Sequence, residues 1–342
     1  MKHIPVLKNE ILNTFSYLSD QPDAIFVDGT VGEGNHSITV AERYLPRRQT
    51  GKKQDTITKF IGIDKDKSAL ELTKENIKKA GMCDNFMLVH DDFKNIKEIL
   101  KKVSDEPSHF AKATRDDQNH ILINGALLDL GVSSMQLDQK DRGFSFTDSR
   151  AQLDMRMDQT QKLDAIIVLN KYPEEKLEQI LKEYGEEKFS RGIAKNICLI
   201  RKNKHIETVG DLIYVLEKSI PLKFQKTSRT HFATKTFQAI RIEVNNELEG
   251  LKEAIDDFVA SLESGGRLAV ITFHSLEDRI VKNTFRELAS DCICPQNAPV
   301  CNCDKVSEVK LINKKPITAS EQEIAENPRS RSAKLRVIEK LF

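Results

Sequence analysis

Two kinds of segment alternate along the chain. Short β-branched and aromatic runs end at polar, mostly acidic side chains, and apolar residues then recur every three to four positions. The first pattern predicts buried strands and the second predicts amphipathic helices. Strands are expected at 25–28, 60–64, 86–90, 126–129 and 267–273. This alternation indicates an open, mostly parallel α/β sheet.

The alternation is interrupted between the fourth and fifth predicted strands. Residues 163–220 show only helical periodicity, and a long helix with one apolar stripe is expected to run to Glu263 and stop at Gly265-Gly266. Two late runs, 309–312 and 335–338, are expected to pair antiparallel at one sheet edge. The sequence therefore predicts seven strands and a helical insertion.

The chain is accordingly divided into a sheet domain that is split by an inserted all-helical domain. The sheet domain is expected to comprise 1–138 and 229–342, and the helical domain 139–228. Two polar stretches without apolar periodicity, 46–59 and 104–120, are expected to be exposed loops.

The loop after the first predicted strand is poor in side chains. Gly32 and Gly34 tolerate positive φ and let a ligand approach the backbone. Ser37 stands where a dinucleotide fingerprint has its third Gly or Ala, and the carboxylate of Glu33 would repel a pyrophosphate. This pattern favours a ligand with a positive centre and no phosphate, such as S-adenosylmethionine. A glycine turn without any ligand is the alternative.

The ends of the second and third predicted strands offer further contacts to an adenosine-type ligand. Asp64 closes the second strand, where a carboxylate can accept hydrogen bonds from both ribose hydroxyls. It lies 30 residues after Gly34, and the polar stretch 46–59 accounts for the excess over the usual spacing of about 20. Phe93 follows the third strand and either covers an adenine or belongs to the core.

Composition sets limits on location and partners. Of the 342 residues, 39% are hydrophobic, and 53 Lys and Arg against 52 Asp and Glu leave a net charge of +1. A nucleic-acid partner would therefore need a local basic patch. No apolar run approaches the ~20 residues of a membrane span, and the N-terminal segment is not typical of a targeting peptide. The expected location is the cytoplasm.

Four of the six cysteines are clustered near the C-terminus. Cys292, Cys294, Cys301 and Cys303 form two C-x-C pairs that could bring four thiolates to one zinc ion. Reduced cysteines in a surface loop are the alternative, because paired C-x-C is not the usual zinc spacing. No metal ligand is assigned from the sequence.

Several longer motifs are spread along nearly the whole chain. They are His3-x-Pro5-Val6-Leu7, Asp28-Gly-Thr-Val-Gly-Glu-Gly-Asn-His-Ser37, Leu128-Asp-Leu-Gly-Val-Ser-Ser134, Arg142-Gly-Phe-Ser-Phe146, Leu153-Asp-Met-Arg-Met-Asp158, Thr236-Phe-Gln-Ala-Ile-Arg-Ile242, Phe273-His-Ser-Leu-Glu-Asp278 and Asn327-Pro-Arg-Ser-Arg-Ser332. With these motifs the chain resembles the bacterial ribosomal RNA small subunit methyltransferase H family (MraW-type). The resemblance implies a Rossmann-like class I S-adenosylmethionine-dependent methyltransferase that modifies the exocyclic N4 of a cytidine in the decoding centre of 16S ribosomal RNA, within the small ribosomal subunit.

The resemblance also implies where the cofactor is bound. Asn35 replaces a glycine that the family usually has, and we expect it to keep the turn in the left-handed region. Met135 replaces a proline in the loop that holds Gln136. The implied cofactor contacts are Gly34, Asn35, His36, Asp64, Phe93, Asp129 and Gln136.

A methyltransferase of this kind must activate a poor nucleophile, because the lone pair of the cytosine amine is delocalised into the ring. A carboxylate that accepts from the amine draws that lone pair out of conjugation. We expect Asp129, Ser133 and Ser134 to face the amine, with His274, Phe144 or Phe146 available to stack on the base. The structural alternatives are that the two serines cap a helix and that His274 bonds within its own turn.

Basic residues are candidates for contacts with RNA phosphates. Three of them lie in the tail, Arg329, Arg331 and Lys334. The alternative is that this stretch is only a solvated segment that leads into the last strand. The competing functions are a non-catalytic RNA-binding factor of ribosome assembly and a nicotinamide (NAD) oxidoreductase. A homodimer is compatible with the sequence, which does not fix the oligomeric state. The other basic candidates are Arg142, Arg156 and Arg229.

Overall fold

The structure is a computed structural model that describes residues 5–21, 23–44, 59–104, 114–116, 120–139, 141–227, 231–294 and 303–342. The chain divides into two compact units. The first comprises Met1–Gly131 and Gly250–Phe342, and the second comprises Val132–Glu249. The second unit thus starts earlier and ends later than the range 139–228 expected from the sequence. Most of the two polar stretches 46–59 and 104–120 lies outside the described residues.

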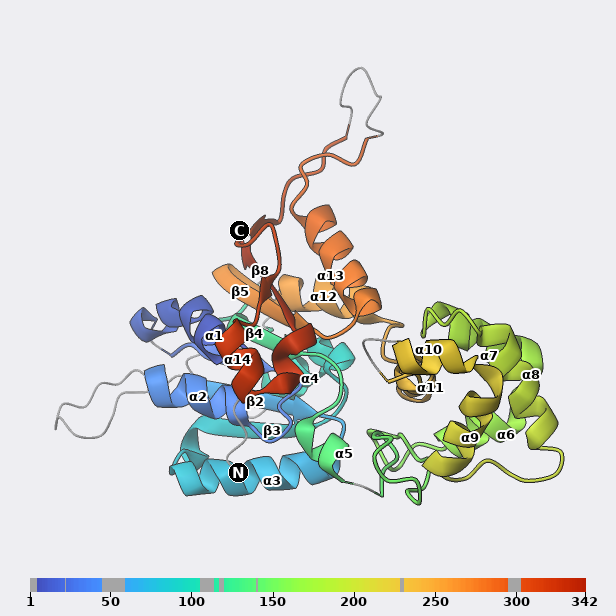
Figure 1. Cartoon of the computed structure of the whole chain (residues 1–342). Coiled ribbons are helices and arrows are strands. Elements are labelled where there is room, and N and C mark those ends of the chain that lie inside the picture. The colour runs from blue at the N-terminus through green and yellow to red at the C-terminus, as the bar shows by residue number, and fades with distance from the viewer. Residues whose placement is uncertain are drawn as a thin grey trace. The chain divides into compact units, whose positions relative to one another are not determined.

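The first unit is built on an eight-stranded sheet (Figure 1). Its strands are β1 (Ile25–Asp28), β2 (Lys59–Asp64), β3 (Phe86–His90), β4 (Ile123–Asp129), β5 (Leu262–Thr272), β6 (Val309–Leu311), β7 (Ile317–Thr318) and β8 (Lys334–Lys340). The order is β3-β2-β1-β4-β5-β8-β6, and β7 also pairs with β8. Strands β1 to β5 are parallel, whereas β8 is antiparallel to its neighbours. The predicted α/β sheet with an antiparallel edge is confirmed, and the two-residue β7 is an addition.

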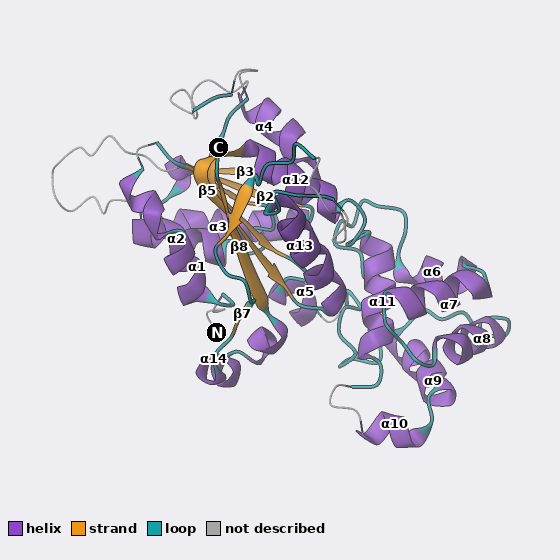
Figure 2. Cartoon of the chain, turned by 90° about the horizontal axis from the view of Figure 1, so that it is seen from above, coloured by secondary structure: helices purple, strands orange, loops and turns teal. Residues whose placement is uncertain are grey.

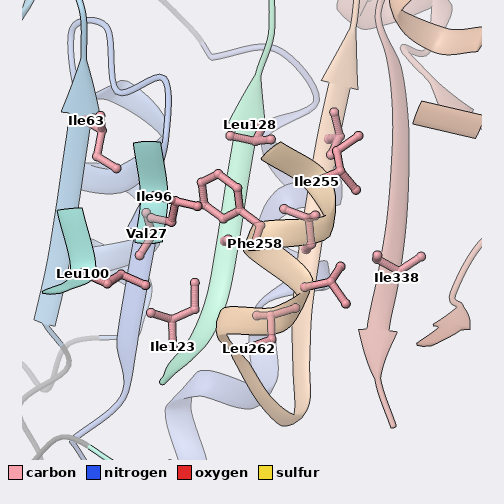
Figure 3. Packing of buried hydrophobic residues seen from close by; sticks show 14 of the residues in the cluster. Val27, Ile63, Ile96, Leu100, Ile123, Leu128, Ile255, Phe258, Leu262 and Ile338 are labelled. Atoms are coloured by element: carbon pink, nitrogen blue, oxygen red, sulfur yellow. The ribbon is translucent and has the colours of Figure 1, made fainter. Parts of the chain in front are cut away.

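Helices cover both faces of this sheet (Figure 2). The cluster of buried residues on one face includes side chains of α4, α12 and α13, and Figure 3 shows Phe258 of α12 within it. The cluster on the other face includes side chains of α1, α2 and α3. The helices of this unit are α1 (Lys8–Thr14), α2 (Asn35–Tyr44), α3 (Lys67–Ala80), α4 (Ile96–Ser104), α12 (Leu251–Ser261), α13 (Ser275–Leu288) and α14 (Glu321–Glu326).

Four phenylalanine rings form a ladder across the second face. Phe15 meets Phe26 edge-on at 4.8 Å between ring centroids, and Phe60 stacks on Phe86 at 4.7 Å. Phe26 and Phe60 lie directly opposite each other in β1 and β2, with centroids 5.6 Å apart. The ladder therefore joins the turn after α1 to three neighbouring strands.

The long helix expected up to Glu263 is wrong. The chain forms α11 (Thr234–Asn245) and α12 instead, separated by Asn246 at φ 50° and Gly250 at φ 74°. Left-handed residues end a helix even where the apolar period continues. Strand β5 begins at Leu262, so Gly265 and Gly266 lie inside a strand rather than ending a helix.

The second unit is helical and has its own apolar core. Residues such as Leu169, Leu181, Ile193, Leu212 and Ile240 are buried together in it. None of the helices in the described part of the chain is long and apolar enough to cross a membrane. The helices of this unit are α5 (Ser134–Asp138), α6 (Ala165–Lys171), α7 (Glu174–Glu183), α8 (Ser190–Ile200), α9 (Val209–Ser219), α10 (Leu222–Thr227) and α11.

Candidate cofactor and substrate site

The glycine turn after β1 adopts the conformation that its residues predict. Gly32 has φ 52° and Gly34 has φ 79°. A Cβ on Gly34 would lie 2.9 Å from Cγ2 of Thr73, whose hydroxyl donates to the carbonyl of Gly32. Asn35 is the first residue of α2 and not left-handed, so the expectation for Asn35 is wrong: Gly34 itself makes the turn.

Asp28 lies at the end of β1, beneath this turn. Its carboxylate accepts a 2.6 Å hydrogen bond from the hydroxyl of Ser37 and a 3.2 Å bond from the backbone N–H of Thr30. Burial raises the pKa of Asp28 to about 6 despite these bonds.

Asp64 stands at the end of the neighbouring strand β2. Its two oxygens each accept a 2.8 Å hydrogen bond, one from the N–H of Gly32 and one from that of Asp66. Burial raises the pKa of Asp64 to about 6. Burial makes the ionised forms of Asp28 and Asp64 unfavourable, and the two carboxylates lie at adjoining strand ends. A negatively charged phosphate ligand is therefore disfavoured here and a positively charged ligand is favoured.

The third acid, Asp129, ends β4 and faces His36 of α2. Oδ2 of Asp129 lies 3.4 Å from Nε2 of His36, and the backbone N–H of Asp129 donates to the hydroxyl oxygen of Thr30 at 2.7 Å. Among the described residues, neither Oδ1 of Asp129 nor Nε2 of His36 has a hydrogen-bond partner, although both atoms are buried. Buried polar atoms of this kind mark a place for a polar ligand.

Phe93 flanks the same corner from the end of β3. A Cβ on Gly29 would lie 3.1 Å from Cβ of Phe93 and 2.5 Å from Cδ2 of Leu128, so a larger residue at this position would force the Leu128 side chain to move. Phe93 is half-buried and also packs against the core. This packing supports the core alternative, and the contact of Phe93 with an adenine stays a prediction.

The loop residues Ser133 and Gln136 form the capping box of α5. The hydroxyl of Ser133 accepts from the N–H of Gln136 at 3.2 Å, and Oε1 of Gln136 accepts from the N–H of Ser133 at 3.0 Å. This favours the structural alternative for Ser133. Ser134 is the first residue of α5, and its side chain lies outside the described part.

His274 caps α13 in the same way. Its Nδ1 accepts from the N–H of Glu277 at 3.4 Å, and the Glu277 carboxylate accepts from the N–H groups of Phe273 and His274 at 2.9 and 3.3 Å. Nε2 of His274 lies 3.1 Å from the other oxygen of Glu277. These bonds favour the alternative in which His274 is held within its own turn.

Two residues expected to contact RNA belong to the interior of the helical unit. Arg142 is only 4% exposed, and its guanidinium donates to the carbonyl oxygen of Arg156 at 2.5 Å and to Oε1 of Gln139 at 3.2 Å. Phe144 is 8% exposed and part of the apolar core. Arg142 therefore holds a loop rather than a phosphate, and Phe144 cannot stack on a base.

Three further candidates are already engaged or lie outside the described residues. The half-buried ring of Phe146 stacks on His231, with 4.4 Å between the ring centroids and 13° between the ring planes. Arg156 forms an ion pair with Asp154 at 2.8 Å. Arg229 lies outside the described residues.

The tail residues lie beside a cleft of about 260 Å³ in the sheet unit. Arg331 is exposed and has no acidic partner among the described residues, whereas Lys334 lies 3.2 Å from Asp278. Arg329 is exposed on the short helical turn that precedes β8. The cleft is lined by Phe273, His274, Ser275, Thr318, Arg331, Ser332, Ala333 and Lys334.

Comparison with known proteins identifies the family. A family model described as the MraW methylase family matches residues 1–341. The chain belongs to the MraW methylase family. The resemblance inferred from the motifs is thereby confirmed.

Curated relatives of this MraW methylase family member align over almost their full length. It is 47% identical to the ribosomal RNA small subunit methyltransferase H of Clostridioides difficile (strain 630), over 99% of each chain. The protein of the same name from Caldicellulosiruptor saccharolyticus is 45% identical, again over 99% of each. Among solved structures, an rRNA methylase from Streptococcus thermophilus is 13% identical over 99% of this chain and 100% of its own, with a TM-score of 0.41. The family model and the curated relatives decide the assignment.

Within this MraW methylase fold, the structure reveals roles that the sequence did not indicate. From the sequence, Ser37 was interpreted only as a departure from a dinucleotide motif. Its hydroxyl donates a hydrogen bond to the carboxylate of the buried Asp28. Thr73 supports the glycine turn from α3. A buried acid followed nine residues later by a small hydroxyl residue is too general a pattern to reveal the first pair.

Proposed function

We propose that this chain transfers a methyl group from S-adenosylmethionine to the exocyclic N4 of a cytidine in the decoding centre of 16S ribosomal RNA. Membership of a methylase family supports methyl transfer. The name shared by the curated relatives supports small-subunit ribosomal RNA as the substrate. The observation that carries the proposal is the acid-rich corner around the glycine turn, where Asp129 and His36 keep buried polar atoms without partners.

The residues at this corner fit a cationic adenosine-type donor. Its sulfonium and ammonium charges would offset the cost of burying Asp28 and Asp64, while a phosphate would increase that cost. Asp64, at the end of β2, would accept from the ribose hydroxyls. The proposed contacts are Gly34, Asn35, His36, Asp64, Phe93, Asp129 and Gln136.

When bound, the donor supplies an electrophilic methyl group, and the protein prepares the nucleophile. We assign that preparation to Asp129, whose unpartnered Oδ1 is available to accept from the amine N–H. Accepting this bond raises the electron density on nitrogen and stabilises the positive charge that develops there. His36, 3.4 Å from the other oxygen, would position the carboxylate.

The decisive experiment measures methyl transfer to small subunits that lack the modification. Asp129→Asn keeps the side-chain shape but weakens the acceptor, so turnover should fall about 10²-fold to 10³-fold. Donor affinity, measured by calorimetry, should change far less. Asp20→Asn, at an exposed acid after α1, is the matched control and should behave like wild type.

Nucleoside analysis of the product identifies the methylated atom. N4-methylcytidine is expected, and a methyl group at another position contradicts the proposed specificity. Full turnover by Asp129→Asn would remove this carboxylate from the chemistry. RNA binding without any methyl transfer would support the non-catalytic assembly factor instead.

For the RNA backbone, we propose that the cleft beside β8 receives phosphate groups through Arg331 and Lys334, with Arg329 nearby. Such contacts release counterions, so each one adds about one unit to the slope of log affinity against log salt. Arg331→Gln and Lys334→Gln should each lower that slope by about one. Lys74→Gln, at an exposed lysine of α3, should leave it unchanged. Equal slopes in all three variants would exclude the cleft as a phosphate site.

A further inference from the structure

Three cysteines gather at one point outside the proposed site. The Sγ atoms of Cys292, Cys294 and Cys303 all lie within 4.8 Å of one another, and the three side chains are half-buried. Cys301, two residues before Cys303 in the sequence, lies outside the described residues. The sulfur atoms of Cys292 and Cys294 thus lie close to that of Cys303, about ten residues later in the chain.

Backbone N–H groups point at two of these sulfur atoms. Ile293 donates to Sγ of Cys303 at 3.4 Å, and Cys294 donates to Sγ of Cys292 at 3.3 Å. Ser290 fixes the start of the segment, because its hydroxyl donates to the carbonyl of Cys292 at 2.6 Å. N–H donors directed at sulfur stabilise a thiolate and recur in the outer shell of metal sites.

In the described parts of the segment that carries the cysteines, 289–294 and 303–308, the large apolar side chains are exposed. These parts follow α13 and precede β6 in the chain, and the N–H of Glu308 donates to the carbonyl of Leu288 at 2.9 Å at their base. The apolar side chains Ile293 and Val306 are 68% and 62% exposed. Among the described residues, burial of Ile293 and Val306 therefore does not hold the two arms of this segment together.

We propose that Cys292, Cys294 and Cys303 bind one Zn²⁺ ion as thiolates. With Zn–S bonds of about 2.3 Å and tetrahedral angles, the sulfur atoms would be roughly 3.8 Å apart, a small adjustment from the observed cluster. Soft thiolate ligands select zinc over hard cations. Each thiol gives up its proton to solvent on binding, so affinity rises with pH. The ion ties the two arms of the segment and takes no part in methyl transfer.

The test uses the full chain, stripped of metal by a chelator under reducing conditions and titrated with Co²⁺ as a spectroscopic probe. One equivalent should give the visible absorption of tetrahedral cobalt and a thiolate charge-transfer band, and Zn²⁺ should displace both. Cys292→Ser and Cys303→Ser should each weaken binding at least 100-fold. Cys83→Ser and Cys198→Ser, at cysteines remote in sequence, are the matched controls and should bind like wild type.

Two further measurements separate metal loss from misfolding. Donor binding and helix content should be unchanged in Cys292→Ser and Cys303→Ser, while proteolysis between residues 289 and 308 should become faster. Absence of the cobalt spectrum in the reduced wild-type chain overturns the proposal. A spectrum of wild-type affinity in Cys292→Ser or Cys303→Ser, or an equal loss in Cys83→Ser, also overturns it.

Discussion

At the scale of single residues, the corner around the glycine turn lowers the stability of the fold, because it buries two carboxylates. Asp28 and Asp64 are held in surroundings that raise the pKa of each to about 6. A folded-state pKa above the unfolded value means that the native state binds a proton more tightly than the unfolded chain. Stability should therefore increase as pH falls from 7 towards 4, through the window set by these two acids.

Replacing Asp28 tests this cost directly. Asp28→Asn can still accept from Thr30 and can donate to Ser37, so it removes the buried charge and keeps the bonds. The free energy of unfolding at pH 7 should rise by up to about 3 kcal/mol, because each pKa unit corresponds to about 1.4 kcal/mol. Urea unfolding at pH 7 and pH 4 measures the change. The gain should vanish at pH 4, and a variant less stable than wild type at pH 7 would contradict the expectation.

Residue chemistry also decides which site residues could be predicted from the sequence. The placement of Asp64 and Asp129 at the ends of β2 and β4 was predictable, because the carboxyl ends of parallel strands meet at one edge of a sheet. Arg142 and Phe144 were misread because a motif shows residue type but not burial. Two of the carbonyl groups that accept from Arg142 belong to residues 14 and 15 positions away, which no local pattern reveals.

At the scale of elements, the irregular stretch before α6 is tied to α11 by one side chain. Asn245 accepts from the N–H of Met157 at 2.7 Å and donates to the carbonyl groups of Met155 and Arg241 at 2.7 and 2.9 Å. It is buried, so these bonds are not exchanged with water. Asn245 thus replaces the regular secondary structure that this stretch lacks.

Asn245→Ala should lower the free energy of unfolding of the helical unit by about 3 kcal/mol, since it leaves buried backbone groups without partners. Asn196→Ala is the matched comparison. The side-chain amide of Asn196 donates a 2.9 Å hydrogen bond to the hydroxyl of Ser219 and is half-buried, so a loss of about 1 kcal/mol is expected. Denaturant unfolding followed by circular dichroism measures both variants. Equal losses of unfolding free energy would show that the hydrogen bonds of Asn245 contribute no more to stability than that of Asn196.

The positions of the strands were predictable to within a few residues because central parallel strands read as continuous apolar runs. The ends of helices were harder to predict from the sequence. The apolar stripe continues from α11 into α12, so periodicity alone joined two helices that Asn246 and Gly250 separate. The two-residue β7 is too short to produce any pattern.

At the scale of the whole molecule, each compact unit contains its own apolar core. We therefore expect the segment Val132–Glu249 to fold when it is produced alone. Circular dichroism should show a helical spectrum, and urea should unfold it in one cooperative transition. The segment 139–228 lacks α11 and the capping box of α5, so it should be much less stable. A non-cooperative transition for Val132–Glu249 would show that this unit depends on the rest of the chain.

The phenylalanine ladder also bears on how the sheet assembles. Strands β1, β2 and β3 are joined through long crossovers, so during folding they can meet in shifted alignments before the native one is reached. A shift by one residue would send Phe60 to the opposite side, away from Phe26 and Phe86. Packing of the four rings thus favours the native register over misaligned intermediates. The same register aligns the carboxyl ends of β1 and β2, which places Asp28 and Asp64 at one corner.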